Sequence, residues 1–121
     1  NHGVRGVTIL GSTGSIGINT LDVLARYPER YRIMALTANT QVDRLFEQCQ
    51  TFMPPKVVML DPRAVIRLKE KIQKSRLAVE VLSGVDGLNT VATHPRTHIV
   101  VAAIVVAVTV VDFSFADRRR R

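Results

Sequence analysis

The chain has few of the residues that build several common kinds of site. A single cysteine among 121 residues excludes an internal disulfide framework and a zinc site made of several cysteines. The longest apolar run, residues 99–111, would form a helix of only about 20 Å, short of the roughly 30 Å hydrocarbon core of a membrane. The first apolar stretch is short and runs into glycines, unlike a signal peptide. We therefore expect no membrane as a partner and a reducing, cytoplasmic compartment.

Positive charge is in excess, but much of it lies at one end. The formal net charge is +7, and residues 118–121 are four consecutive arginines, without which it is +3. We interpret the charge as a solvated face plus a tail. Only six residues are aromatic, and they are not interleaved with basic residues as in a nucleic-acid-binding surface, so we expect no nucleic acid as a partner. A hydrophobic content of 46% predicts one domain with a packed core.

Short apolar runs alternate with amphipathic stretches along the chain. The apolar runs predict strands and the periodic stretches predict helices. We expect strands at 7–10, 32–37, 57–60, 77–82 and 98–106, and helices at 15–27, 41–52, from 62 onward, and at 83–92. This alternation, with short connections, predicts an α/β fold with a mostly parallel sheet.

Each of the first three predicted helices should bury one apolar stripe. The stripes are Ile18, Leu21 and Leu24 or Ala25; Val42, Leu45, Phe46 and Cys49; and Val65, Leu68 and Ile72. Basic residues such as Arg63 and Lys74 fall mostly outside the third stripe. Asp61 has the position of a helix cap, with Pro62 as the first helical residue.

A glycine-rich turn between the first predicted strand and helix carries the strongest functional signal. Its glycines follow the spacing G-x-x-G-x-x-G. Gly11 can make the tight turn out of the strand, Gly14 lets the backbone approach a pyrophosphate, and Gly17 allows close packing of the helix. The amides of residues 13–16 would point at the phosphates, at the positive end of the helix. The motif predicts a dinucleotide site in a Rossmann-like, doubly wound, three-layer αβα fold.

The end of the second predicted strand helps to choose the cofactor. An NAD site usually places an acidic residue there to hold the ribose 2′-hydroxyl. Here the strand is followed by Asn39, Thr40 and Gln41, and the first acid is Asp43. The three polar side chains can donate hydrogen bonds to a 2′-phosphate, and Arg44 can add charge, although the same residues could simply begin the next helix. The pattern favours NADP(H) over NAD(H).

Other reactive residue types have simpler structural explanations. Cys49 falls on an apolar stripe, which is typical of a buried thiol rather than a nucleophile. His2, His94 and His98 lack the spacing of metal ligands. We therefore expect neither a catalytic residue nor a metal ligand in this chain.

Several segments resemble the N-terminal part of the 1-deoxy-D-xylulose-5-phosphate reductoisomerases. The most specific is TILGSTGSIG at residues 8–17, followed by TLDV at 20–23. ALTAN at 35–39, EVLSG at 80–84 and VAAIV at 101–105 continue the resemblance in the same order. It covers residues 7 to about 105.

The resemblance implies a bacterial, NADPH-dependent oxidoreductase of non-mevalonate isoprenoid biosynthesis. That family rearranges and reduces 1-deoxy-D-xylulose 5-phosphate, a sugar phosphate, to 2-C-methyl-D-erythritol 4-phosphate, using a divalent metal (Mg or Mn), as a homodimer. By resemblance, residues 13–16 would bind the pyrophosphate, residues 39–41 the adenosine ribose and its phosphate, and residues 102–103 would lie near the nicotinamide. The cofactor-binding residues that we expect are Gly11, Thr13, Gly14, Ser15, Ile16, Gly17, Asn39, Thr40, Gln41, Ala102 and Ala103.

The chain departs from the family pattern in two places. The family often has a basic residue in the segment that matches 39–41, and this sequence has none there. After residue 105 the family continues with a glycine-containing loop, a helix and an N-K-E motif, whereas residues 106–121 are apolar and then polyarginine. We expect residues 1–105 to form the NADPH-binding domain, C-terminally incomplete, with the catalytic and helical domains absent and the 121-residue chain alone inactive.

Two alternatives remain open from the sequence. Another NAD(P)-binding reductase would need a Tyr-x-x-x-Lys pair or a catalytic cysteine, and neither Tyr27 nor Tyr31 has a lysine four residues later. A basic α/β module could instead bind nucleic acid through its third helix and the arginine tail.

Overall fold

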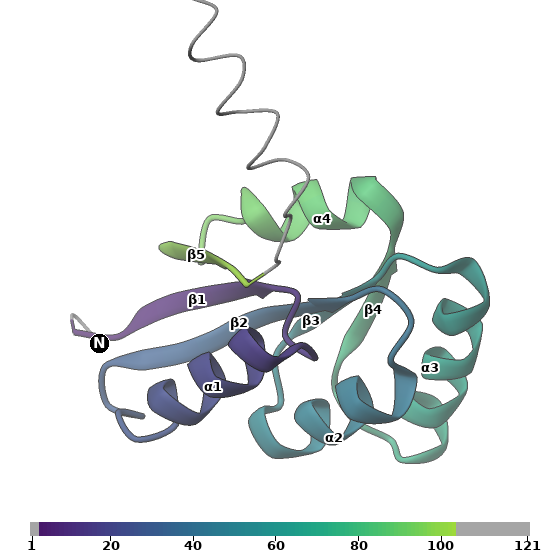
Figure 1. The fold of residues 1–121 in the computed structure, drawn as a ribbon, viewed down its shortest axis with the longest axis horizontal. Coiled ribbons are helices and arrows are strands. Elements are labelled where there is room, and N and C mark those ends of the chain that lie inside the picture. The colour runs from purple at the N-terminus through teal and green to yellow at the C-terminus, as the bar shows by residue number, and fades with distance from the viewer. Residues whose placement is uncertain (1–2, 104–121) are drawn as a thin grey trace, which may run out of the picture.

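The computed structural model describes residues 3–103, which form a five-stranded sheet flanked by helices (Figure 1). The strands are β1 (Arg5–Leu10), β2 (Tyr31–Ala38), β3 (Lys56–Met59), β4 (Glu80–Ser83) and β5 (Ile99–Ala102). The helices are α1 (Ser15–Leu24), α2 (Val42–Phe52), α3 (Pro62–Lys74) and α4 (Gly84–Ala92). All neighbouring strands are parallel, which confirms the predicted fold class. None of the helices within this part of the chain has the length and apolar character that a membrane crossing needs.

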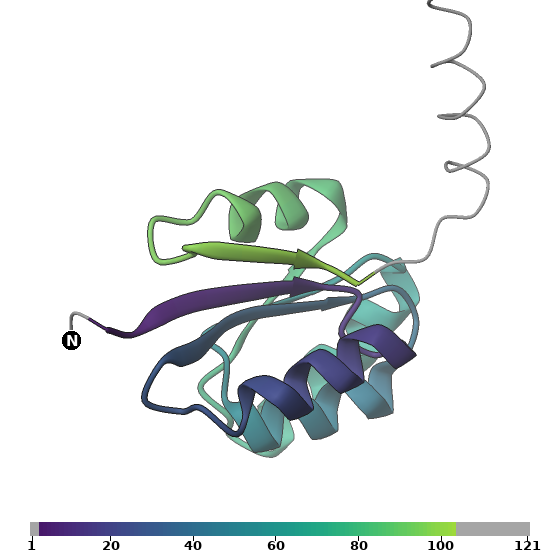
Figure 2. The same cartoon turned by 60° about the vertical axis from the view of Figure 1, so that its left-hand side comes forward.

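The helices cover the two faces of the sheet unequally. Helices α1, α2 and α3 lie against one face, and α4 lies against the other (Figures 1 and 2). The larger core fills the space between the sheet and α1–α3, and its fully buried residues include Ile9, Leu36, Leu45 and Leu68. A smaller core of Ala35, Val58 and Val91 lies under α4. The predicted three-layer αβα arrangement is therefore confirmed.

The strand order reverses once along the sheet. The order is β4-β3-β2-β1-β5, so the chain steps from β1 to β4 in one direction and then returns through α4 to β5, beside β1. Because crossovers between parallel strands are right-handed, the helices that connect β1 to β4 lie on one face of the sheet. The connection from β4 back to β5 runs in the opposite direction, so α4 lies on the other face. In open parallel sheets, ligands bind outside the carboxyl ends of the strands at such a reversal, here between β1 and β5.

The first helix differs from its predicted bounds and inner face. We expected residues 15–27, but α1 ends at Leu24. The amide of Tyr27 then donates to the carbonyl of Leu24 in a tighter turn, because Pro28 disfavours a helical backbone at the residue before it. Ile18, expected on the inner face, is 38% exposed. The buried residues of α1 are Gly17 and Leu21, so the stripe lies beside the predicted one.

The fourth strand begins later than predicted. We expected residues 77–82, but β4 pairs with β3 only from Glu80 onward. Arg76 has a left-handed backbone with φ 55°, and the amide of Leu77 donates to the carbonyl of Ile72 at 3.2 Å. Leu77 therefore still belongs to the C-terminal turn of α3. Of the predicted strand 98–106, residues 99–102 are in β5, and its end lies outside the described residues.

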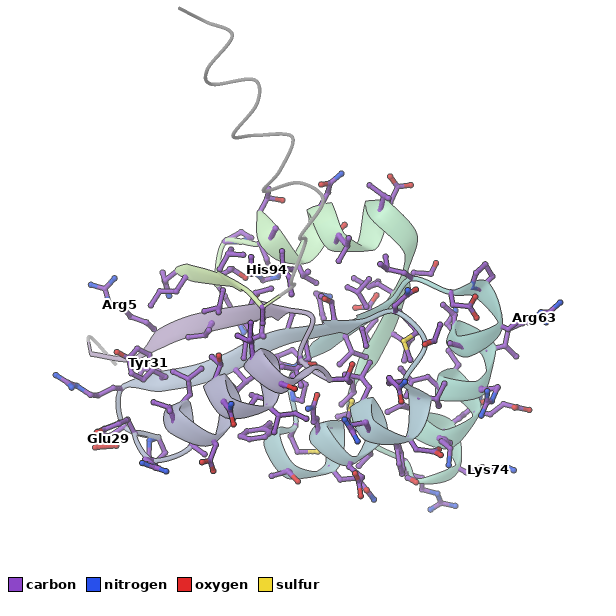
Figure 3. The ribbon with its side chains drawn as sticks, in the orientation of Figure 1. Arg5, Glu29, Tyr31, Arg63, Lys74 and His94 are labelled. Atoms are coloured by element: carbon purple, nitrogen blue, oxygen red, sulfur yellow. The ribbon has the colours of Figure 1, made fainter. Side chains whose placement is uncertain are left out.

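Helices α2 and α3 follow their predicted patterns. Their predicted apolar stripes are buried, apart from Phe46, which is partly buried. The Asp61 carboxylate accepts a hydrogen bond from the Ala64 amide at 3.0 Å, which confirms the predicted cap of α3. Arg63 and Lys74 point from α3 away from the sheet (Figure 3). These two helices therefore provide a fixed platform beside the ends of β2 and β3.

Candidate cofactor site

The glycine-rich loop, residues 11–14, leaves β1 through a turn that is fastened to the end of β2. Gly11 has φ 83°, a left-handed conformation that favours glycine, so the predicted tight turn is confirmed. The amides of Gly11 and Ser12 donate to the carbonyl of Thr37 at 3.1 and 2.9 Å. The Gly11 amide also donates to the Thr37 hydroxyl at 2.9 Å. These bonds fix the start of the loop at the carboxyl edge of the sheet.

The loop also packs directly onto α1 at Gly17. A Cβ at this position would lie 2.3 Å from the Gly11 carbonyl oxygen and 2.6 Å from Cα of Ser12. Only glycine fits there without a shift of the backbone, which confirms that Gly17 allows close packing. By contrast, a Cβ at Gly14 would find the nearest protein atom, the Gly11 oxygen, at 4.0 Å. Gly14 therefore leaves open space beside the loop.

The N-terminus of α1 presents backbone donors without protein acceptors. Its N-cap, Gly14, supplies no side-chain cap, and the first turn contains no acidic residue. Within residues 3–103, the amides of Thr13, Gly14, Ser15 and Ile16 donate to no protein acceptor. Such unpaired amides, together with the positive end of the helix dipole, bind anions. The local backbone therefore suits a phosphate group.

A cavity of about 330 Å³ lies at this edge of the sheet, at the reversal of strand order. Five of the predicted cofactor residues line it, namely Gly11, Thr13, Gly14, Asn39 and Ala103. The remaining walls come from the ends of β1, β2 and β3 and from α4 through Leu10, Thr37, Ala38, Leu60 and Leu88. Hollows of similar volume occur elsewhere, as at the amino ends of the strands (about 390 Å³). The loop and the switch in strand order, not the volume, distinguish the cavity at the carboxyl edge.

The other predicted cofactor residues, Ser15, Ile16, Gly17, Thr40, Gln41 and Ala102, do not line this cavity. Ser15 and Ile16 are exposed on the first turn of α1, and Gly17 is buried beneath them. Ala102 is exposed on β5, whereas the amide of Ala103 donates to the carbonyl of Leu10 at 2.8 Å. The side chains of Asn39, Thr40 and Gln41 are exposed, and none of them makes a hydrogen bond among the described residues. They remain available to a ligand.

The charged residues that follow β2 bind different partners. The carboxylate of Asp43, the first acid after β2, pairs with Lys71 of α3 at 3.3 Å. Arg44 instead contacts the loop, where its Nη1 donates to the carbonyl of Thr13 at 3.2 Å. The arrangement brings a positive charge next to the loop, while the Asp43 carboxylate is paired with α3. This favours a phosphate-bearing ligand over one with a free ribose hydroxyl.

Three polar residues at the loop were not singled out in the sequence. Thr37 accepts from Gly11, and Gln48 of α2 makes two hydrogen bonds with Ser12. Gln48 lies three residues after Leu45 on the buried side of α2, with 8% exposure. Its position beside an apolar helical stripe was the one feature of the sequence that could have indicated a buried polar contact.

The remaining reactive side chains have structural roles. Cys49 is fully buried, and burial raises the pKa of its thiol to about 12, which confirms a structural thiol. Nδ1 of His98 accepts from the Gly6 amide at 2.9 Å, and Nδ1 of His94 accepts from the Arg96 amide at 3.1 Å. In the described part of the chain, no three His, Cys, Asp or Glu residues come together as a metal site would need.

Comparison with known proteins identifies the family. The family model for 1-deoxy-D-xylulose 5-phosphate reductoisomerase matches residues 7–116. The chain belongs to this family. A reductoisomerase from Nitrosococcus oceani is 54% identical over 100 residues, which are 83% of this chain and 25% of that protein. One from Nitrosospira multiformis is 53% identical over 102 residues, 84% of this chain and 26% of that protein.

Solved structures of the family share the fold. A reductoisomerase in complex with NADPH, fosmidomycin and magnesium matches with a TM-score of 0.79 and 39% identity over 83% of this chain and 24% of that one. The Zymomonas mobilis enzyme in complex with NADPH matches with a TM-score of 0.71 and 37% identity, over 78% and 24% of the two chains. The chain thus spans about a quarter of the length of these relatives. Family membership argues against the alternative of an unrelated reductase.

Proposed function

We propose that this chain forms the NADPH-binding part of an enzyme that converts 1-deoxy-D-xylulose 5-phosphate to 2-C-methyl-D-erythritol 4-phosphate. Membership of the reductoisomerase family and the NADPH complexes of its relatives support the proposal. The observation that carries it is the set of amides at the N-terminus of α1 that have no acceptor among residues 3–103, beside a cavity at the switch point of the sheet.

The residues present fit the cofactor at three places. The amides of residues 13–16 bind the diphosphate, and Gly14 leaves room for it. The side chains of residues 39–41 hold the adenosine ribose and its 2′-phosphate, with Arg44 adding charge. Residues 102–103 lie toward the nicotinamide, which supplies a hydride when the cofactor is bound. The protein's own contribution is to orient the cofactor at the carboxyl edge of the sheet.

The remaining properties of the whole enzyme are proposed from the family alone. Relatives bind magnesium and fosmidomycin, and we propose a divalent cation and a sugar-phosphate substrate for the enzyme of which this chain is a part. Residues 3–103 do not fit the cation, because they contain no group of three His, Cys, Asp or Glu side chains that could hold it. A homodimer, a cytoplasmic location, a boundary near residue 105 and inactivity of the 121-residue chain alone stay predictions. The named relatives come from bacteria.

Substitution of Gly14 tests the cofactor site. Gly14→Ala adds a methyl group where no protein atom is closer than 4.0 Å, so the protein itself tolerates it, but the methyl occupies the space that a diphosphate needs. We expect NADPH binding, followed by calorimetry, to weaken by at least about tenfold, equivalent to about 1.4 kcal/mol. Gly3→Ala is the matched control, because a Cβ there also meets nothing within 4 Å. Equal affinity of both variants would contradict this site.

A further inference from the structure

Gln48 of α2 makes a reciprocal pair of hydrogen bonds with Ser12 of the glycine-rich loop. Its Oε1 accepts from the Ser12 hydroxyl at 2.7 Å, and its Nε2 donates to the Ser12 carbonyl at 2.9 Å. The two residues are 36 positions apart and both are buried, Ser12 completely. A buried amide is costly unless its donor and acceptor are both satisfied. The hydrogen bonds of Gln48 therefore stabilise the conformation in which the Ser12 carbonyl points toward α2.

The direction of this carbonyl fixes the direction of the next amide. In a planar trans peptide the C=O and N–H groups point in opposite directions. The Ser12 carbonyl and the Thr13 amide belong to one peptide, so a carbonyl held toward α2 turns the Thr13 amide away from α2. Thr13 lines the cavity, and its amide is one of the donors without a protein acceptor in the described part of the chain.

The following peptide is held from the same helix. Arg44 precedes Gln48 by four residues, which places both on one face of α2. Its Nη1 donates to the Thr13 carbonyl, which belongs to the peptide of the Gly14 amide. Two successive carbonyls of the loop are therefore held from one helix, and that helix is itself anchored in the core by Val42, Leu45 and Cys49.

We propose that Gln48 is a positioning residue that aims the Thr13 amide at the diphosphate of the cofactor. The proposal rests on the proposed NADPH site and deepens it. Gln48 does not line the cavity, and it acts through the Ser12 peptide. Preorganising a donor before binding raises affinity, because binding then does not have to order it.

The test compares two ligands on two variants of the full chain. Gln48→Met keeps the length of the side chain and removes both hydrogen bonds, while Gln50→Met makes the same change at an exposed site on the same helix. NADPH contains the diphosphate, whereas 2′-AMP carries only the adenosine and the 2′-phosphate. We expect Gln48→Met to weaken NADPH binding by about tenfold and 2′-AMP binding by less than about twofold. Gln50→Met should change neither.

A second variant, Gln48→Glu, tests the same role if Gln48→Met fails to fold. A protonated carboxyl group has the same donor and acceptor as the amide, whereas a carboxylate has no donor for the Ser12 carbonyl. Binding of NADP⁺, relative to the unmodified chain at each pH, should therefore be weak at pH 8 and recover as the pH falls toward 5. Loss of a merely structural contact would not restore diphosphate binding selectively over 2′-AMP binding.

The outcomes separate the two proposals. If the unmodified chain binds NADPH and Gln48→Met binds it as tightly as Gln50→Met does, the positioning role is overturned and the cofactor site stands. Equal losses for NADPH and 2′-AMP would also overturn it, because they would indicate a general loosening of the fold. If the unmodified chain binds no NADPH, the proposed function fails and the positioning role fails with it.

Discussion

At the scale of single residues, Gly17 lies where α1 packs tightly against the backbone of the loop. A methyl group there would lie within 2.7 Å of three backbone atoms of Gly11 and Ser12, and backbone cannot move aside as a flexible side chain can. We expect Gly17→Ala to lower the free energy of unfolding by about 1–3 kcal/mol, measured by urea denaturation. Gly3→Ala, in open space, should change it by less than about 0.5 kcal/mol. Equal midpoints would mean that the loop adapts to the methyl group.

The buried Cys49 thiol should make the free energy of unfolding fall as the pH becomes alkaline. Burial raises the pKa of this thiol from 9.0 to about 12, so the folded state holds the proton over a range in which the unfolded state has lost it. The stabilisation is complete below pH 9 and is lost as the pH rises toward 12, by about 1.4 kcal/mol per unit. Urea denaturation between pH 8 and 10.5 should show this slope for the unmodified chain. Cys49→Ala should lack it, and parallel slopes would contradict the assignment.

Residues near the loop differ in how far the sequence reveals their roles. Gly11 and Gly17 can be predicted, because their spacing between a strand and a helix demands residues without a Cβ. Gln48 and Thr37 could not be assigned, because their partners lie 36 and 26 positions away. The role of a buried polar side chain depends on which residues pack against it, and a single sequence does not state those contacts directly.

At the scale of elements, α3 begins with a side-chain cap. The Asp61 carboxylate accepts from the Ala64 amide, and Pro62 follows as the first helical residue. We expect Asp61→Ala to lower the free energy of unfolding by about 1 kcal/mol, because an amide of the first turn loses its acceptor. Asp61→Asn keeps an acceptor and should cost much less, as followed by thermal or urea denaturation. Equal losses for Ala and Asn would assign the effect to the charge rather than to the cap.

The elements themselves follow from apolar periodicity, and their ends do not. The stripes of α2 and α3 were predicted correctly, since repeats at three and four residues fit only one face of a helix. The predicted end of α1 and the predicted start of β4 were each wrong by about three residues. These two positions depend on Pro28 and on the left-handed turn at Arg76. Such turns involve local backbone geometry that periodicity does not describe.

At the scale of the whole molecule, the strand order decides where a ligand can bind. Alternating strands and helices predict a parallel sheet, but no residue pattern states that β5 returns to the side of β1. Handedness supplies the missing step, since right-handed crossovers in two directions put α4 opposite α1–α3. The return brings Ala103 to the edge where the glycine-rich loop and Asn39 already follow the paired strands β1 and β2. The site is therefore a property of the topology as well as of the motif.

Cofactor preference should appear in the stability of the whole domain. A ligand that binds the folded state at 100 times its Kd adds about 2.7 kcal/mol, which raises the Tm of a domain this size by roughly 10 °C or more. We expect NADPH to raise the Tm more than NADH at equal concentration, because no carboxylate follows β2 to hold a ribose hydroxyl and Arg44 lies at the loop. Asn39→Asp introduces that carboxylate and should reduce or reverse the difference. Asn89→Asp makes the same charge change at an exposed site on α4 and should preserve it. Equal shifts with both cofactors in the unmodified chain would show that the 2′-phosphate is not recognised.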